Sequence, residues 1–139
     1  GQRFSKPEYF HGRPSSAGSG YDAANSSGSN LGPTSAKLNA GLPDEPATEG
    51  DQSYPGIHQL AVLYRRTNGL ADDVKLPSDA VTRSGSGLDP HISPENAGLQ
   101  LPRVAKARGL EEAAVKTLVA AATEGRFLGI FGEPRVNVL

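Results

Sequence analysis

The stretch from Ser84 to Pro94, Ser-Gly-Ser-Gly-Leu-Asp-Pro-His-Ile-Ser-Pro, holds the residue types of this chain that are best suited to chemistry. Gly85 and Gly87 permit positive φ angles and let another group approach the main chain closely. Ser93 before Pro94 is typical of a helix start, because serine caps backbone N–H groups and proline fills a position that needs none. The sequence therefore predicts a glycine loop that leads into a helix N-terminus.

A glycine loop before a helix could cradle phosphate, since its backbone N–H groups can point at the anion. The string Ser84-Gly85-Ser86-Gly87 fits neither phosphate-loop fingerprint, and no Gly-Lys-Ser/Thr follows it to place a lysine on the phosphates. A structural tight turn is favoured over a phosphate cradle, and the residues alone leave both open.

Other chemistry finds little support in the residue spacing. The same glycine string misses the Gly-x-Ser-x-Gly nucleophile elbow by one glycine position. Asp89 and His91 could share one face of an extended stretch, where a hydrogen bond at the rim is the commoner outcome. His11, His58 and His91 lack metal-ligand spacing. We expect no catalytic residue and no metal ligand in this chain.

Composition bounds the class of protein. The 139 residues suit one domain, which we expect to span residues 1–139, and their hydrophobic fraction is only 36%. A net charge of −1 does not indicate the excess of basic residues that nucleic-acid binding requires. Cysteine is absent, which excludes disulfides and thiolate sites. No apolar run approaches the ~20 residues that span a bilayer.

The N-terminal half is expected to be rich in loops. Residues 1–14 predict an extended segment that docks Phe4, Tyr9 and Phe10 into the core, because aromatic residues favour strands. The Ser/Gly/Asn-rich residues 15–41 fit a flexible linker or an ordered functional loop equally well. Residues 36–53 are predicted to form a mobile acidic loop.

The C-terminal half carries the regular elements. Periodicity predicts helices over 53–68, over 94–108 with Pro102 inside, and over 110–124. Residues 80–83 and 135–139 are predicted to be short strands. Together these elements predict an α+β fold, with a small sheet of short strands, about three packed helices and a loop-rich N-terminal half.

Five segments together resemble one family, the C subunit of the Kdp-type potassium-transporting P-type ATPase. The resemblance runs in order along nearly the whole chain and is weakest between residues 36 and 53. The segments that carry it are Tyr9-Phe10-His11-Gly12-Arg13-Pro14-Ser15, Gly28-Ser29-Asn30-Leu31-Gly32-Pro33, Ser84 to Pro94, Pro102 to Leu110, and Gly132 to Leu139.

The resemblance implies a non-catalytic subunit of a bacterial inner-membrane complex that imports potassium with ATP. It implies three partners: a potassium-channel-like A subunit, an ATP-hydrolysing B subunit and a small F subunit. It also implies an extracytoplasmic domain, and we expect this chain to lack the family's N-terminal transmembrane helix and its extreme C-terminus. Members are described as assembling the complex and as catalytic chaperones that raise the ATP affinity of the B subunit.

Two hypotheses assign residues to these roles. In the first, two loops form one ordered face that docks the A subunit near its ion entrance, with these contact candidates: Tyr9, Phe10, Arg13, Ser29, Asn30, Leu31, Asp89 and His91. In the second, the chain has no intrinsic cofactor but binds ATP as an autonomous module. Its contact candidates are Ser84, Gly85, Ser86, Gly87, Leu88 and Gln100, with Arg103 as the basic contact.

Overall fold

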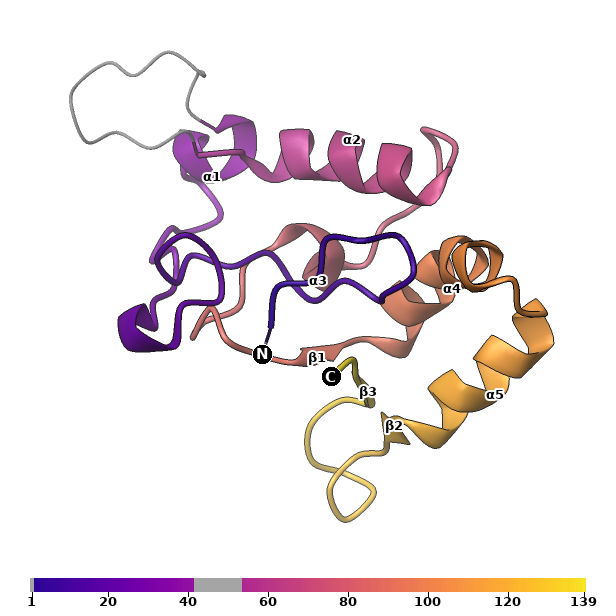
Figure 1. Cartoon of the computed structure of the whole chain (residues 1–139). Coiled ribbons are helices and arrows are strands. Elements are labelled where there is room, and N and C mark those ends of the chain that lie inside the picture. The colour runs from indigo at the N-terminus through magenta and orange to yellow at the C-terminus, as the bar shows by residue number, and fades with distance from the viewer. Residues whose placement is uncertain (1, 42–53) are drawn as a thin grey trace.

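The computed structural model describes residues 2–41 and 54–139 (Figure 1). Within these residues, loops and four helical segments precede residue 90, and all three strands and two further helices follow it. The elements in chain order are η1 (Ala23–Asn25), α1 (Ala36–Ala40), α2 (Ile57–Asn68), α3 (Ser78–Val81), β1 (His91–Ile92), α4 (Pro94–Arg108), α5 (Glu112–Ala121), β2 (Thr123–Glu124) and β3 (Arg135–Asn137).

The three strands form one antiparallel sheet in the order β1-β3-β2. Val136 at the centre of β3 pairs with Ile92 on one side and with Thr123 on the other. Val136 and Ile92 are 3% and 2% exposed, so their shared face is covered by protein. The predicted α+β fold and the C-terminal strand are both confirmed.

Helix α4 begins and ends as its sequence predicts. The Oγ of Ser93 accepts a hydrogen bond from the N–H of Asn96 at 3.0 Å, and Pro94 fills the first helical position. Pro102 lies inside the helix, and Gly109 ends it with φ 64°. The glycine loop of residues 84–88 therefore does lead, through β1, into a capped helix.

The hydrophobic core consists of two small clusters that meet at α4. One contains Leu101, Val104 and Ala105 with Val115 of α5, and the other contains Ile92, Ala97 and Val136. Phe10 of the N-terminal segment packs against both clusters. Docking of Phe10 into the core is confirmed, whereas Tyr9 is 37% exposed and residues 2–14 contain no strand.

Two predicted elements differ from the structure. Residues 80–83 are not a strand, because α3 occupies 78–81 and the N–H of Thr82 donates to the carbonyl of Ser78 at 2.9 Å. The helix predicted over 110–124 is α5, which stops at Ala121 because Thr123 and Glu124 pair with β3. A local helical hydrogen bond decides the first case, and pairing with another strand decides the second.

Helix α2 confirms the helix predicted before Asn68, with Gly69 as its C-cap at φ 65°. Helix α1 takes up residues 36–40, the first part of the stretch predicted to be a mobile acidic loop. The rest of that stretch, residues 42–53, lies outside the described residues.

Candidate functional site

Two distant segments of the chain are joined by hydrogen bonds at the glycine loop. The Oγ of Ser15 donates to the carbonyl of Gly87 at 2.7 Å. The carbonyl of Ser86 accepts from the Oγ of Ser26 at 2.9 Å and from the N–H of Ser27 at 3.0 Å. Where it meets residues 84–87, the Ser/Gly-rich stretch is thus an ordered loop and not a flexible linker.

The glycines of this joint allow one backbone to approach another. A Cβ on Gly87, whose φ is +70°, would lie 2.7 Å from the Cβ of Ala17 and 2.8 Å from the carbonyl oxygen of Ser27. A Cβ on Gly28 would lie 2.7 Å from the carbonyl oxygen of Gly85. The group that comes close is this chain's own backbone, which favours the structural tight turn over the phosphate cradle.

Three of the predicted contact residues lie together beside this joint. The Nδ1 of His91 is 3.0 Å from the Oδ1 of Asp89, which also accepts the backbone N–H of His91 at 3.0 Å. The Nη1 of Arg13 is 3.8 Å from the Oδ2 of Asp89. The three side chains are between a quarter and a third exposed, so they form a rim that a partner can reach.

The other predicted contact residues lie in three places: directly after the joint, beside Arg108, and against the core. Ser29, Asn30 and Leu31 follow the joint directly, and Asn30 is exposed with φ 53°. The guanidinium carbon of Arg108 lies 5.4 Å from the centroid of the Tyr9 ring. Phe10 packs against the hydrophobic core. We name the loop face as Arg13, residues 26–31, Gly85, Ser86, Asp89 and His91.

Gln100 and Arg103, predicted as nucleotide contacts, bond to other parts of the protein. The Oε1 of Gln100 accepts from the N–H of His11 at 2.7 Å and from the Nη2 of Arg103 at 2.8 Å. Its Nε2 donates to the carbonyl of His11 at 2.9 Å and to the Oδ1 of Asn96 at 2.8 Å. Gln100 is 1% exposed, and its side-chain amide makes hydrogen bonds to other residues of this protein.

The guanidinium of Arg103 is also hydrogen-bonded to other residues of this protein. Its Nε donates to the Oδ1 of Asn68 at 2.9 Å, and its Nη1 donates to the carbonyls of Tyr9 and Pro7. Burial lowers the pKa of the Arg103 guanidinium. No hydrogen bond among the described residues joins Gln100 or Arg103 to residues 84–88, so the predicted nucleotide contacts form two separate groups.

A connected set of polar side chains continues from Gln100 through α4. The Oδ1 of Asn96 accepts from the hydroxyl of Tyr64 at 2.7 Å, and the Nδ2 of Asn96 donates to Asp79 at 2.9 Å. Asp79 also accepts from the N–H and the Oγ of Ser93, at 2.8 and 2.9 Å. We call this set the Gln100 network; it consists of His11, Tyr64, Asp79, Ser93, Asn96, Gln100 and Arg103.

Burial sets the protonation of two members of the Gln100 network. It raises the pKa of the Tyr64 hydroxyl, and the charge of Asp79 adds to the effect. Burial also lowers the pKa of the His11 imidazole. The backbone N–H and carbonyl of His11 are both bonded to the buried amide of Gln100.

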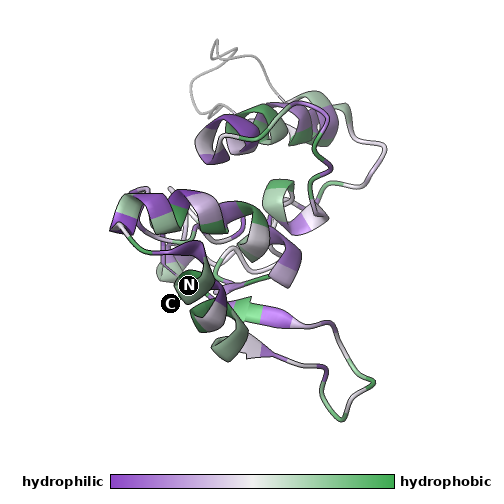
Figure 2. Ribbon diagram, turned by 90° about the vertical axis from the view of Figure 1, so that its right-hand side faces the viewer, coloured by the Kyte–Doolittle hydropathy of each residue, from purple (hydrophilic) through white to green (hydrophobic). Residues whose placement is uncertain are grey.

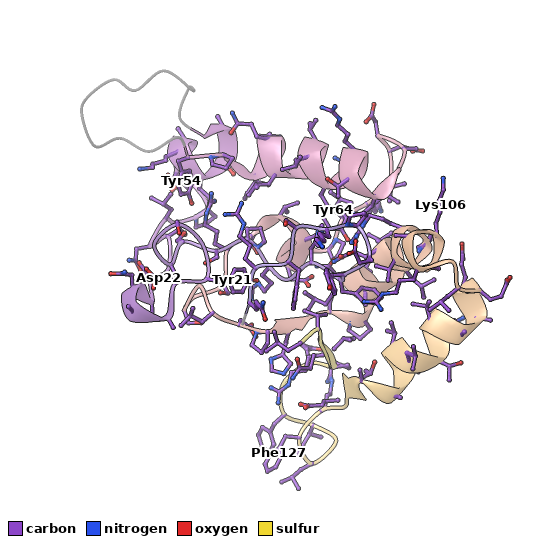
Figure 3. All side chains as sticks on the ribbon, in the orientation of Figure 1. Tyr21, Asp22, Tyr54, Tyr64, Lys106 and Phe127 are labelled. Carbon is purple, nitrogen blue, oxygen red and sulfur yellow. The ribbon has the colours of Figure 1, made fainter. Side chains whose placement is uncertain are left out.

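The connection between β2 and β3 exposes a cluster of large apolar side chains. Phe127, Leu128, Ile130 and Phe131 are 72%, 75%, 70% and 60% exposed. Figure 2 shows this connection reaching away from the rest of the ribbon, and Figure 3 shows Phe127 at its outer end. We call these four residues the apolar tip. None of the four was among the site residues predicted from the sequence.

Ion pairs flank the apolar tip. The Nη2 of Arg126 is 2.7 Å from the Oε2 of Glu133, and the Nη2 of Arg135 is 2.8 Å from the Oε2 of Glu124. Each cation thus has a carboxylate beside it, and the base of the tip carries no excess charge.

Residues 2–41 and 54–139 contain no group of three His, Cys, Asp or Glu side chains placed to hold a metal ion. None of the helices in these ranges has the length and hydropathy needed to cross a bilayer.

Comparison with known sequences decides the family. The profile of the family described as "K+-transporting ATPase, c chain" matches residues 1–139. The chain belongs to the KdpC family. The resemblance of the five sequence segments to this family is thereby confirmed.

Three curated members of the KdpC family, each named "Potassium-transporting ATPase KdpC subunit", match over all 139 residues. The protein of Caulobacter vibrioides (strain NA1000 / CB15N) is 51% identical, that of Mycobacterium bovis (strain BCG / Pasteur 1173P2) 50%, and that of Koribacter versatilis (strain Ellin345) 47%. The chain covers 61%, 66% and 63% of their lengths, so it spans just under two thirds of these relatives.

Proposed function

We propose that this chain is part of an accessory, non-catalytic subunit of an ATP-driven potassium import complex. Its partners are the potassium-channel-like A subunit, the ATP-hydrolysing B subunit and the small F subunit. The support is family membership together with relatives that carry the name of a potassium-transporting ATPase subunit. The domain lies on the extracytoplasmic side of a bacterial inner membrane, and a preceding helix anchors it there.

The observation that carries the proposal is the preformed loop face. Hydrogen bonds from Ser15 and Ser26 to the glycine loop fix the backbone there, while Gly85 and Ser86 remain exposed. The rim of Arg13, Asp89 and His91 lies beside it. A surface that is ordered before binding loses little conformational entropy on association, which suits a docking role.

The apolar tip supplies a second contact of different character. Contiguous exposed apolar groups usually mark an interaction site, because leaving them in water is unfavourable. The neighbouring cations are paired with Glu133 and Glu124, so the tip suits a neutral, apolar surface. Its occupant in this proposal is the apolar surface of another subunit of the same complex.

The chaperone role follows from linkage. An extracytoplasmic domain cannot touch ATP in the cytoplasm, so it must act through the conformation of the complex. A domain that binds more tightly to the conformation with high ATP affinity raises that affinity by the ratio of its two binding constants. Removal of the domain should therefore weaken ATP binding by the B subunit without removing any ATP contact.

Co-purification of the full-length subunit with its tagged partners tests the proposal. We expect Asp89→Ala, Leu31→Asp and the double change Phe127→Ser with Phe131→Ser each to reduce recovery of the complex. Matched controls are Asp72→Ala, at an exposed carboxylate, and Val62→Asp, at a side chain on α2 that is 67% exposed. Recovery of all three variants at the level of the controls would sink the proposal.

The alternative, an autonomous nucleotide-binding module, finds no favourable observation. Gln100 and Arg103 are used internally, and the N–H of Leu88 is bonded to the Oγ of Ser86 at 3.1 Å. Amide NMR of this chain with millimolar ATP is the direct test. We expect the signals of Gly85, Ser86 and Gly87 not to move, and a saturable shift of all three would restore the alternative.

A further inference from the structure

A cavity of about 360 Å³ separates the N-terminal segment from helix α2. Its lining comes from residues between Arg3 and Tyr21, from Pro55 and residues of α2, and from Ala80 and Arg83. In Figure 3 the labelled Tyr21 lies among the loops below α2. The labelled Tyr64 belongs to the C-terminal half of that helix. The volume is within the range of small-molecule sites in proteins.

The charges that line this cavity have one sign. Its basic residues are Arg3, His11, Arg13 and Arg83, and no Asp or Glu is among the residues that line it. Apolar walls come from Phe4, Tyr21, Tyr64, Leu60 and Leu63.

Two of the three guanidinium groups have no carboxylate within ion-pair distance among the described residues. Arg3 donates from Nη1 to the carbonyl of Ser19 at 3.2 Å. Arg83 donates from Nη2 to the carbonyl of Pro55 at 3.1 Å and lies over the ring of Tyr54, 3.8 Å from its centroid. Both groups therefore keep donors free for a ligand.

Arg13 has a carboxylate neighbour but also an unused donor. Its Nη1 is 3.8 Å from Asp89, while its Nε is buried and makes no hydrogen bond. A buried donor without a partner costs free energy that a bound acceptor restores.

Burial adds a reason for an anion to enter. It lowers the pKa of the Arg83 guanidinium, which is the direction expected for a cation that has lost water without gaining a counterion. Arginine also forms paired hydrogen bonds with the oxygens of carboxylates and phosphates.

We propose that this cavity binds a phosphate monoester with an aromatic or aliphatic body. The guanidinium groups of Arg3, Arg13 and Arg83 contact the dianionic phosphate. The body lies between the aromatic rings of the N-terminal segment and the leucines of α2. This site shares Arg13 with the loop face and has no residue in common with the apolar tip.

Calorimetric titration of the chain with phenyl phosphate tests the proposal. We expect saturable binding, with Arg83→Gln and Arg3→Gln each weakening it at least fivefold, because each removes a charge-assisted contact. The matched control is Arg66→Gln, at an exposed arginine of α2 that does not line the cavity. Benzyl alcohol, which has a similar body without the phosphate, is expected to give no heat.

Amide NMR spectra of the same samples locate the ligand and report on folding. Shifts confined to residues 3–21, 55–68 and 80–83, with otherwise native spectra for the two variants, support the proposal. No binding of phenyl phosphate up to 10 millimolar, or equal binding by all three arginine variants, overturns it.

Vesicles identify the source of the phosphate. Phosphatidic acid in phosphatidylcholine vesicles offers the same phosphate monoester on a lipid. Sedimentation of the chain with these vesicles, lost in Arg83→Gln and Arg3→Gln, assigns the site to a lipid headgroup. Binding of phenyl phosphate without sedimentation assigns it to a soluble compound.

Discussion

The Gln100 network and the apolar tip reverse the usual relation between residue type and burial. Asn96 and Gln100 are polar and 1% exposed, whereas Phe127 and Leu128 are apolar and 72% and 75% exposed. In the network, the side-chain amide groups find partners from α2, α3 and the N-terminal segment. At the tip, no other described element covers the side chains. In these two regions, burial follows the supply of partners rather than hydropathy.

The two regions also differ in what holds their backbone. Side-chain bonds connect the Gln100 network across elements that are distant in sequence. The apolar tip is closed locally, since Phe127 and Phe131 exchange two backbone hydrogen bonds of 2.9 Å. Changes in the network should therefore affect the stability of the whole domain, and changes in the tip should affect binding alone.

The largest effect is expected at Gln100. Replacement by Ala leaves His11, Asn96 and Arg103 without their buried partner, which should lower the free energy of unfolding by about 2–4 kcal/mol. Urea unfolding measures it. The control Gln2→Ala, at an exposed glutamine, should change stability by less than about 0.5 kcal/mol. Equal stability of the two variants would contradict the role given to the network.

Gly87→Val should have the next largest effect. The valine Cβ would clash with Ala17 and Ser27, and its φ of +70° is unfavourable for a β-branched residue, so we expect a loss of roughly 2 kcal/mol or more. The matched control is Gly98→Ala in α4, where a Cβ meets nothing and helix propensity should add up to about 1 kcal/mol. Thermal unfolding of both variants gives the comparison.

A pH dependence of stability should arise from His11. Because burial lowers the pKa of His11 in the folded state, the unfolded chain binds this proton more tightly, and the contribution of His11 to stability is lost as the pH falls below about 6.5. His11→Gln should flatten this part of a urea unfolding profile between pH 7.5 and 5. The exposed His58, replaced in the same way, should leave the profile unchanged.

The smallest effect on stability is expected at the apolar tip. Phe127→Ser with Phe131→Ser removes no buried contact, so the free energy of unfolding should change by at most about 0.5 kcal/mol. Recovery of the complex should nevertheless fall. A large loss of stability in this double variant would show that the tip packs within the domain and would remove the contrast between the two regions.

The sequence predicted the helices whose ends are marked by capping residues, proline or glycine. Ser93-Pro94 and Gly109 delimit α4, and Asn68-Gly69 ends α2. Residues 80–83 and 122–124 were misassigned, because contacts within a four-residue helix decide the conformation of the first segment and pairing with β3 that of the second.

The candidate site was predictable in part for the same reason. The rim of Arg13, Asp89 and His91 was anticipated, since Asp89 and His91 are two residues apart. The cavity and the Gln100 network were not, because they join residues of α2, α3 and α4 to residues near the N-terminus, such as His11. The pair Asn96 and Gln100, one helical turn apart, was the one local signal of the network. The same spacing of polar residues also occurs on exposed helices, so it does not by itself indicate a buried network.

The order of strands in the sheet has a consequence for biosynthesis. Strand β3 lies between β1 and β2, although it is the last of the three to be translated. Until residues 135–137 have left the ribosome, His91 and Ile92 have no strand to pair with, and Ile92 and Ala97 lack the cover of Val136. Completion of the sheet is thus a late event in the life of the nascent chain, and a stalled or shortened product would present an open edge to chaperones and proteases.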